Sequence, residues 1–331
     1  MAESGFLLIA ALLLTLAAEF VNGWTDAPNA VATVISTRVL SPSLAVLMAA
    51  VLNIVGALVT GTAVAATLGK GIVIPEVIGL PVVIAATLTV VVWSTAAWVY
   101  GIPTSESHEL IAGLTGAGLA AAGPSVLVWE GWQKVLIGLG FSTFLGFFLG
   151  MIIMTSLYWI LRRTSLSSIR GIFSRLQILS AAFMAFSHGS NDGQKFMGIF
   201  VLALVLGGKM THFAVPVWLM LLCGAVMGIG TAFGGWRIIR TMGFKITKLE
   251  PINGFAAETS GGLAILLASA FGIPLSTTHC IGTSIMGVGA IKRFSAVRWG
   301  IARNIVLTWV ITFPVCFALG YLFTWLLGII L

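Results

Sequence analysis

Long apolar runs separated by short polar joins fill this chain. In the first half they occupy 5–20 with 31–35, 44–68, 78–100 with 111–122, and 134–161. Runs of about 20 apolar residues are what an α-helix needs to cross a bilayer. The second half repeats the order from residue 176 onward, with a crossing at 213–233 between a polar-interrupted helix and a hairpin. The pattern predicts an all-α polytopic membrane protein.

Composition places these runs in lipid rather than in a water-soluble core. Of the 331 residues, 59% are hydrophobic and 8% are charged, with a mean hydropathy of +1.09. A water-soluble domain of this length would not tolerate such a balance. The net charge of +7 therefore reflects the basic loops that orient a membrane protein, and no nucleic-acid partner is expected.

The basic residues gather at four places, which sets the expected orientation. Short loops rich in Lys and Arg stay in the cytoplasm. Tracing the chain from them puts both termini outside the cytoplasmic (inner) membrane. Thirteen of the seventeen Lys and Arg belong to these places: Arg38; Arg162, Arg163, Arg170 and Arg175; Arg237, Arg240, Lys245 and Lys248; Lys292, Arg293, Arg298 and Arg303.

Polar, glycine-punctuated stretches interrupt two of the helical runs at matching positions. The stretch 186–195 carries a histidine, an amide, an acid and a lysine, and 20–29 repeats its Phe, Gly and Asp 166 positions earlier. An acid at bilayer depth costs about 2.5 to 3.5 kcal/mol on insertion scales, so two acids at matching places are expected to serve function. The glycines and Pro28 predict broken helices at 22–30 and 188–195.

Two turns rich in glycine and hydroxyl residues give an independent sign of duplication. Residues 101–108 match 272–279 at an offset of 171, and each stretch predicts a helical hairpin that turns there. Two motifs at nearly one offset, in halves whose charged loops require opposite orientation, indicate an inverted-topology repeat of 1–165 and 166–331. Such repeats build secondary transporters, whose sites lie near the midplane where discontinuous helices meet.

The polar groups expected at that midplane suit an oxyanion. Helix starts at the breaks and hairpins would present free N–H groups, which attract anions, and hydroxyls cluster beside them. A tetrahedral oxyanion has enough acceptor oxygens to use them all. The predicted anion site comprises Thr104, Ser105, Ser276 and Thr277, the amides around Gly23 and Gly189, and Asn29 and Asn191.

Carboxylates at the same depth suit a small cation or a proton. The predicted coupling site comprises Asp26, Asp192, Lys195, Glu258 and His188. One cavity could hold anion and cation together, each offsetting the other's burial cost. No cofactor is expected, and whether a divalent metal travels with the anion stays open.

Plainer roles remain open for several residues. Either acid alone could be structural, and Glu258 could simply bond exposed backbone. The hairpin histidines His108 and His279 could be packing residues rather than substrate contacts or a proton relay. Less weight falls on three acids that could lie near an interface or face a partner helix: Glu19, Glu106 and Glu109.

Two other functional classes fit less well. An intramembrane hydrolase would need a catalytic constellation, but 108–112 lacks the second histidine of a His-Glu-x-x-His zinc motif and no Gly-x-Ser-x-Gly elbow occurs. No catalytic residue is predicted, and the protein is not expected to be an enzyme. A passive anion channel would not need paired buried acids, which would repel its anion.

The interrupted stretches resemble the duplicated signature of the PiT inorganic phosphate transporter family, and 188–195 is especially similar to its bacterial Pit branch. The hairpins extend the resemblance over both halves. It implies uptake of inorganic phosphate coupled to sodium or to protons, in the bacterial branch largely as a neutral complex with a divalent metal, and a homodimer. Sulfate permeases share the architecture, so sulfate stays an alternative. The similar residues are Gly23-Trp24-Thr25-Asp26-Ala27-Pro28-Asn29-Ala30 and Gly189-Ser190-Asn191-Asp192.

Three positions depart from the family pattern. Thr25 replaces Asn, Pro28 replaces Ala, and Lys195 stands where the first repeat has Asn29. An ammonium there could take the place of a sodium ion beside Asp192. We therefore predict a symporter that works by alternating access and is coupled to protons, with at least one sodium site weakened. Sodium coupling is the alternative.

Overall fold

The computed structural model describes residues 2–26, 28–233 and 235–330, and in these ranges every regular element is a helix, apart from one isolated bridge between Val73 and Leu127. The first half forms α1 (Ala2–Thr25), α2 (Pro28–Ser36), α3 (Pro42–Val59), α4 (Ala63–Lys70), α5 (Leu80–Tyr100), α6 (Glu106–Ala122) and α7 (Trp129–Leu161). The second half forms α8 (Leu166–Leu206), α9 (Val217–Phe233), α10 (Trp236–Arg240), the π-helical turn η3 (Thr241–Lys245), α11 (Pro251–Ala270), α12 (Thr277–Lys292) and α13 (Trp299–Ile330). Short turns of 3-10 helix lie at η1 (Pro75–Val77), η2 (Pro124–Val126) and η4 (Phe294–Ala296).

The helices have the length and surface of membrane spans. Six of those described are long and apolar enough to cross a bilayer, and the bent α9–α10 pair would make a seventh. Large apolar side chains point outward from α7 and α13, such as Phe144 (66% exposed) and Val310 (65% exposed). Apolar side chains on the outside are expected where the solvent is lipid. The prediction of an all-α polytopic membrane protein is confirmed.

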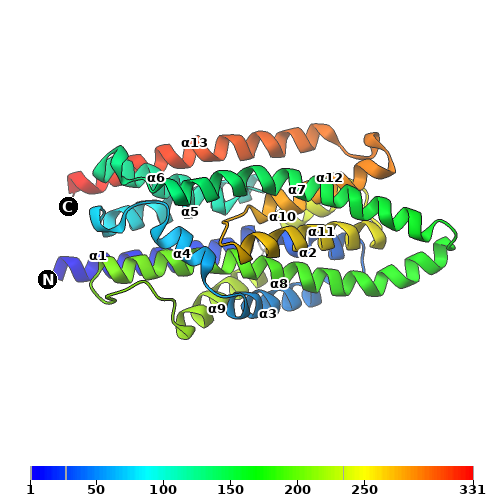
Figure 1. Ribbon diagram of the computed structural model, residues 1–331, viewed down its shortest axis with the longest axis horizontal. Coiled ribbons are helices and arrows are strands. Elements are labelled where there is room, and N and C mark those ends of the chain that lie inside the picture. The colour runs from blue at the N-terminus through cyan, green and yellow to red at the C-terminus, as the bar shows by residue number, and fades with distance from the viewer. Residues whose placement is uncertain (1, 27, 234, 331) are drawn as a thin grey trace.

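The two halves contain the same kinds of element in the same order: a long helical region, an apolar helix, a short helix, a hairpin and a last long helix (Figure 1). Their contacts are exchanged between the halves. Helix α1 packs on α9 and α8 packs on α3, while α6 packs on α13 and α12 packs on α7. The start of α1 and the end of α13 lie at one end of the molecule, and the α7–α8 loop lies at the other (Figure 1). Each half therefore completes the packing of the other.

The first predicted break lies where α1 ends at Thr25 and α2 begins at Pro28, and Ala27 lies outside the described residues. Proline lacks an N–H and its ring would clash inside a continuing helix, so it suits the first position of a new one. The N–H of Asn29 donates to the Asp26 carbonyl at 2.9 Å. Asp26 therefore lies at the junction of two helices.

The second predicted break, at 188–195, is wrong because α8 runs without interruption over Leu166–Leu206. No proline lies in this stretch, and its glycines serve packing rather than a turn. A Cβ added at Gly189 would lie 2.1 Å from the carbonyl oxygen of Asn53 on α3. Small residues at such contacts let two helix backbones approach closely.

Gly23 has the same role in α1. A Cβ there would lie 2.2 Å from the carbonyl oxygen of Met227 on α9. Because both Gly23 and Gly189 lie inside helices, their N–H groups are not the unbonded amides of a helix start. The expectation that these two glycines offer free amides to an anion is therefore corrected.

Replacing Gly189 by Ala should destabilise the protein because its new methyl group would push α3 away from α8. Overpacking of this kind costs about 1–3 kcal/mol. We expect a lower thermal unfolding midpoint for the purified variant in detergent. Gly171→Ala is the matched control on the same helix, because a Cβ at Gly171 meets nothing within 4 Å. Equal midpoints for the two variants would contradict the packing role.

Both predicted hairpins are present, with turns at 101–105 and 271–276. Gly101 (φ 66°) and Gly272 (φ 65°) adopt the left-handed conformation where α5 and α11 end. Glycine tolerates this conformation because it has no Cβ. The hairpins place the starts of α6 and α12 inside the molecule.

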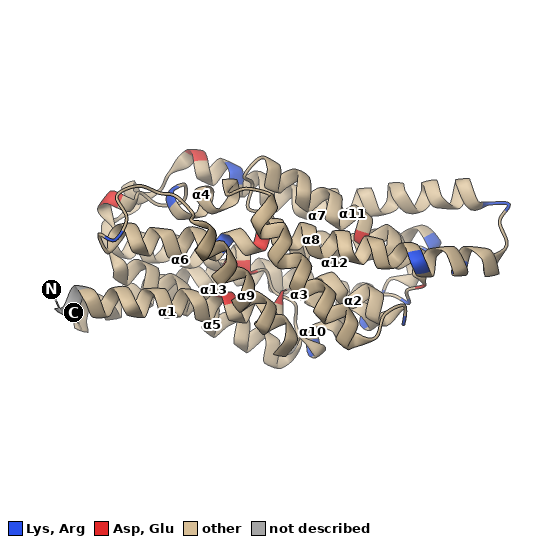
Figure 2. Cartoon of the chain, turned by 90° about the horizontal axis from the view of Figure 1, so that it is seen from below, with Lys and Arg blue, Asp and Glu red and all other residues tan. Residues whose placement is uncertain are grey.

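Basic residues line a cavity of about 1110 Å³, which we name the basic cavity, beside the α7–α8 loop. Figure 2 shows Lys and Arg mainly toward the two ends and several Asp and Glu in the interior between them. All four predicted basic places contribute to the lining, so they share one side of the molecule. That this side is cytoplasmic stays a prediction. The basic residues of the lining are Arg38, Arg162, Arg170, Lys248, Lys292 and Arg298.

Candidate functional site

Asp26 lies at the α1–α2 junction against the start of α12. Its carboxylate accepts hydrogen bonds from Asn29 Nδ2 at 2.7 Å, from Thr277 Oγ1 at 3.3 Å and from the Thr278 hydroxyl. Asn29 Nδ2 also lies 2.8 Å from Thr278 Oγ1. The carboxylate is only 2% exposed, so these polar contacts replace water around it.

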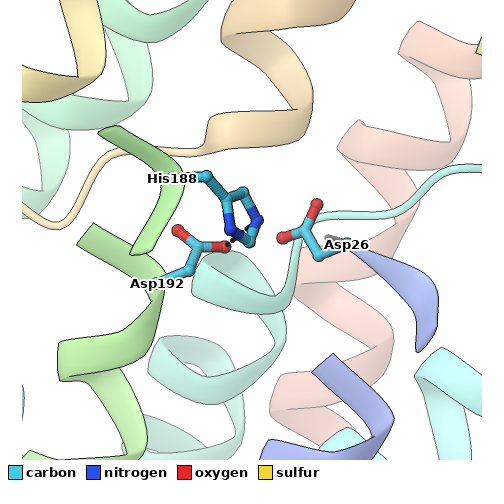
Figure 3. Close-up of side chains that lie close together, drawn as sticks. All are labelled: Asp26, His188 and Asp192. Atoms are coloured by element: carbon cyan, nitrogen blue, oxygen red, sulfur yellow. Dashed lines mark ion pairs between the residues drawn. The ribbon is translucent and has the colours of Figure 1, made fainter. Parts of the chain in front are cut away.

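Asp192 faces Asp26 from the middle of α8 (Figure 3). Spacings of three and four residues bring Lys195 and His188 to the same helix face. The Lys195 Nζ atom lies 2.6 Å from Asp192 Oδ1, and His188 Nε2 lies 3.4 Å from Asp192 Oδ2. His188 Nδ1 in turn lies 3.2 Å from Asn53 Oδ1 on α3. The result is a fully buried ion pair with an imidazole beside it.

Thr277 connects the two acids. Its hydroxyl lies 3.0 Å from Asp192 Oδ2 and 3.3 Å from Asp26 Oδ2. A hydroxyl carries one proton and can donate to only one carboxylate at a time. The hydrogen bond can therefore switch between the two halves of the molecule.

Asp26, His188 and Asp192 each offer a ligand atom that lies within 4.8 Å of the others (Figure 3). Carboxylate oxygens suit hard cations, and an imidazole nitrogen also suits transition metals. Lys195 supplies one fixed positive charge to two carboxylates. The arrangement can therefore accept a further positive charge, as a proton or a metal cation.

The tips of the two hairpins meet next to this cluster. Ser107 Oγ donates to the Leu275 carbonyl at 2.9 Å, and the rings of His108 and His279 stack at 4.5 Å. His279 also stacks on Trp309 at 3.8 Å. The two histidines therefore pack against each other, and the positive ends of α6 and α12 come close together.

Ser105 and Ser276 cap these helices. Their Oγ atoms accept the N–H groups of His108 and His279 at 3.4 and 3.2 Å. Accepting this bond leaves each hydroxyl proton free to donate elsewhere. Together with the buried Thr104, these two serines place hydroxyl donors that suit an anion at the starts of α6 and α12.

Two predicted site residues lie apart from the cluster. Asn191 points to the second hairpin, where Nδ2 donates to Ser269 Oγ at 2.9 Å and to the Ile273 carbonyl at 3.2 Å. Glu258 accepts from Gln177 Nε2 at 3.1 Å, and from two hydroxyls on α2 and α8. Asn191 thus ties α8 to the hairpin, and Glu258 ties α11 to α2 and α8.

Sequence reasoning missed or underweighted other buried polar residues. Glu106, given little weight, is 1% exposed and accepts from Thr25, and Glu109 is 0% exposed and accepts from Ser94. Asn53, which contacts His188, was missed. A lone amide inside the apolar run 44–68 was the available signal.

Comparison with known proteins gives a consistent result for both halves. The model described as "Phosphate transporter family" matches residues 22–169 and 161–320. A probable low-affinity inorganic phosphate transporter of Rhizobium meliloti is 45% identical over 93% of this chain and 92% of its own length. Its Bacillus subtilis counterpart, of the same name, is 41% identical over 98% of each chain.

A solved structure titled "The sodium-dependent phosphate transporter" superposes with a TM-score of 0.84, at 26% identity over 98% of this chain and 100% of that one. The relatives are transporters, and the chain is a transporter rather than an enzyme. With both halves matched and identities above 40% over nearly the whole length, the chain belongs to the phosphate transporter family.

Proposed function

We propose that this protein is a secondary active symporter that imports inorganic phosphate together with protons. The observation that carries the proposal is the buried cluster of Asp26, His188, Asp192 and Lys195 beside the hairpin tips. Acids at bilayer depth are costly and usually mark an ion or substrate path. Here they adjoin hydroxyls and helix starts that suit an oxyanion, which supports joint binding of an anion and a driving ion.

Phosphate would bind between the hydroxyls of Thr277 and Thr278 and the starts of α6 and α12, where Thr104, Ser105 and Ser276 add donors. The names of the relatives, low-affinity inorganic phosphate transporters, favour phosphate over sulfate. The two carboxylates would repel a bare anion, so positive charge must enter with it. Protons, sodium or a divalent metal held by Asp26, His188 and Asp192 could supply that charge.

Lys195 favours protons as the driving ion. Its ammonium, 2.6 Å from Asp192, holds the position that a small cation would take beside that carboxylate. A sodium ion there would meet strong repulsion from it. The sodium-dependent relative makes sodium coupling the alternative, with Asp26 and Asn29 as its ligands.

Alternating access would arise if the two halves are an inverted repeat whose paired elements exchange conformations. Their matching element order and exchanged contacts support this. The cluster is buried, as expected for a site that is closed to both sides between its two access states. We place the chain in the inner membrane as a homodimer with both termini outside.

The test is uptake of radiolabelled phosphate by purified protein in liposomes, with sodium, pH and magnesium gradients varied separately. We expect accumulation driven by an inward proton gradient with sodium absent, and competition by phosphate and arsenate stronger than by sulfate. A strict sodium requirement would refute proton coupling. Equilibration without accumulation under every gradient would refute symport.

A further inference from the structure

Glu19 is a buried carboxyl group to which the proposed mechanism gives no role. It is 0% exposed on α1, and neither of its oxygens has a hydrogen-bond partner among the described residues. Asn22, also 0% exposed, leaves both its amide atoms without partners there too. A spacing of three residues puts both side chains on one helix face. Four polar atoms without protein partners therefore gather inside the molecule.

The other buried acids are in a different situation. Each of them has at least one oxygen bonded to a hydroxyl, an amide or an ammonium. They are Asp26, Glu106, Glu109, Asp192 and Glu258. In the described part of the chain Lys195 is the sole buried Lys or Arg, and Asp192 pairs with it. An ionised Glu19 would have no direct hydrogen-bond or ion-pair partner among the described residues, which is so costly that the group is expected to stay neutral by binding a proton.

The surroundings of Glu19 favour a proton over a metal ion. Helix α1 packs on α5, α8 and α9 and adjoins α2. The titratable groups on these elements that interact with Glu19 are Asp192 and Lys195 from α8 and Cys223 from α9. His188 on α8 and Asp26 at the junction with α2 belong to the neighbouring cluster, and α5 brings only Tyr100, at its exposed end. The Lys195 ammonium and the Asp192 carboxylate both act electrostatically on Glu19. A metal cation would be repelled by that ammonium, whereas a proton neutralises the carboxylate itself.

We propose that Glu19, with Asn22 beside it, is a second proton site beyond the Asp26–Asp192 cluster, and that its proton must accompany phosphate for accumulation. This inference rests on the proton-coupled symport proposed above. The carboxylate takes up one proton to become a neutral acid and returns it on release. Asn22 can serve both forms, because an amide N–H is able to donate to a carboxylate and an amide oxygen is able to accept from a carboxylic acid.

Phosphate binding and protonation of Glu19 are coupled through the charge of Lys195. Phosphate bound near Lys195 would cancel part of the ammonium's field at Glu19 and so favour the protonated acid. By linkage, a protonated Glu19 raises the affinity for phosphate by the same factor, on the order of tenfold. When phosphate leaves, the ammonium again favours the carboxylate, and the proton follows the anion out.

Glu19→Gln tests this, since glutamine imitates the neutral acid. In liposomes the variant should keep exchange of external for internal phosphate but lose accumulation driven by a proton gradient. Its phosphate affinity should no longer tighten on acidification as that of the wild-type protein does. Phosphate itself also changes its protonation state with pH, so a control variant is needed. Glu130→Gln, at an exposed position on α7, should show the same pH dependence as the wild-type protein.

The outcomes separate the two proposals. Absence of proton-driven uptake in the wild-type protein would defeat proton coupling as a whole. Proton-driven accumulation by both wild type and Glu19→Gln would defeat the role of Glu19 alone, as would loss of exchange in a folded Glu19→Gln protein. Should that variant not fold, Glu19→Asp keeps the carboxyl group one methylene shorter. It should show a shifted pH dependence of uptake, and an unchanged profile would overturn the assignment.

Discussion

Replacing Asp26 by Asn should abolish phosphate accumulation while leaving the protein folded. Asparagine has the size of aspartate and one carbonyl oxygen to accept from Asn29 or Thr278, so the junction of α1 and α2 keeps part of its bonding. The negative charge is lost, and with it the attraction for the driving ion. Loss of a hydrogen bond to a charged group, about 1.5–3 kcal/mol, corresponds to about a 10- to 150-fold fall in ion binding. The measurement is gradient-driven uptake into liposomes.

Asp192→Asn should also abolish accumulation, but for two reasons. It removes a ligand of the cluster and leaves the Lys195 ammonium buried without its partner, which costs about 3–5 kcal/mol. A double Asp192→Asn/Lys195→Met variant should recover the thermal unfolding midpoint but not transport. If either single variant, Asp26→Asn or Asp192→Asn, still accumulated phosphate, the two acids would not form the coupling site.

Lys195→Asn should change the driving ion. Removing the ammonium leaves Asp192 without its positive partner, and the new amide oxygen adds a cation ligand, as Asn29 Oδ1 could beside Asp26. A sodium ion could then take the vacated charge position. Uptake without sodium should fall by at least about tenfold, equivalent to 1.4 kcal/mol, and added sodium should restore it. Initial rates of phosphate uptake across a sodium series give the answer.

A matched control for this change is Lys209→Asn. Lys209 lies in the loop beyond the end of α8, so its removal should leave the ion dependence unaltered. Unchanged, sodium-independent uptake by Lys195→Asn would show that the ammonium does not replace a transported cation.

Much of the fold was predictable because its causes are local or repeated. Apolar runs of spanning length predict membrane helices. The glycines at 101 and 272 predict the hairpin turns that the structure contains, since they end α5 and α11 with positive φ. The echo between 20–29 and 186–195 indicated that Asp26 and Asp192 serve one site, and both lie in one buried cluster.

The continuous α8 could not be predicted from its own residues. Glycine frees a backbone to turn, but it also lets a neighbouring helix come close, and only α3, more than a hundred residues earlier in the chain, decides between these roles at Gly189. The departure of Asn191 toward Ser269 follows from the same fact. In a continuous helix, adjacent residues 191 and 192 point about 100° apart, so they cannot both face Asp26.

The burial of Glu19 and Glu106 could not be predicted from the sequence for a different reason. Sequence position alone does not say whether an acid in an apolar run faces lipid headgroups, a partner helix or a closed interior. Thr25, 81 residues away in sequence, supplies the contact that holds Glu106 inside. For Glu19 the exchanged packing of α1 against α9 decides burial, and hydrophobic periodicity carries no sign of it.

The uninterrupted α8 has a mechanical consequence. Its 41 residues make a rod about 60 Å long, roughly twice the thickness of the hydrocarbon layer, and its first turns reach the wall of the basic cavity through Ile169 and Arg170. A tilt of α8 would move His188, Asp192 and Lys195 together as one rigid group. Asp26 lies instead at the junction of the two shorter helices α1 and α2. The distance between the Asp26 and Asp192 carboxylates should therefore lengthen and shorten during transport. A displacement of the start of α8, near Arg170, would change that distance.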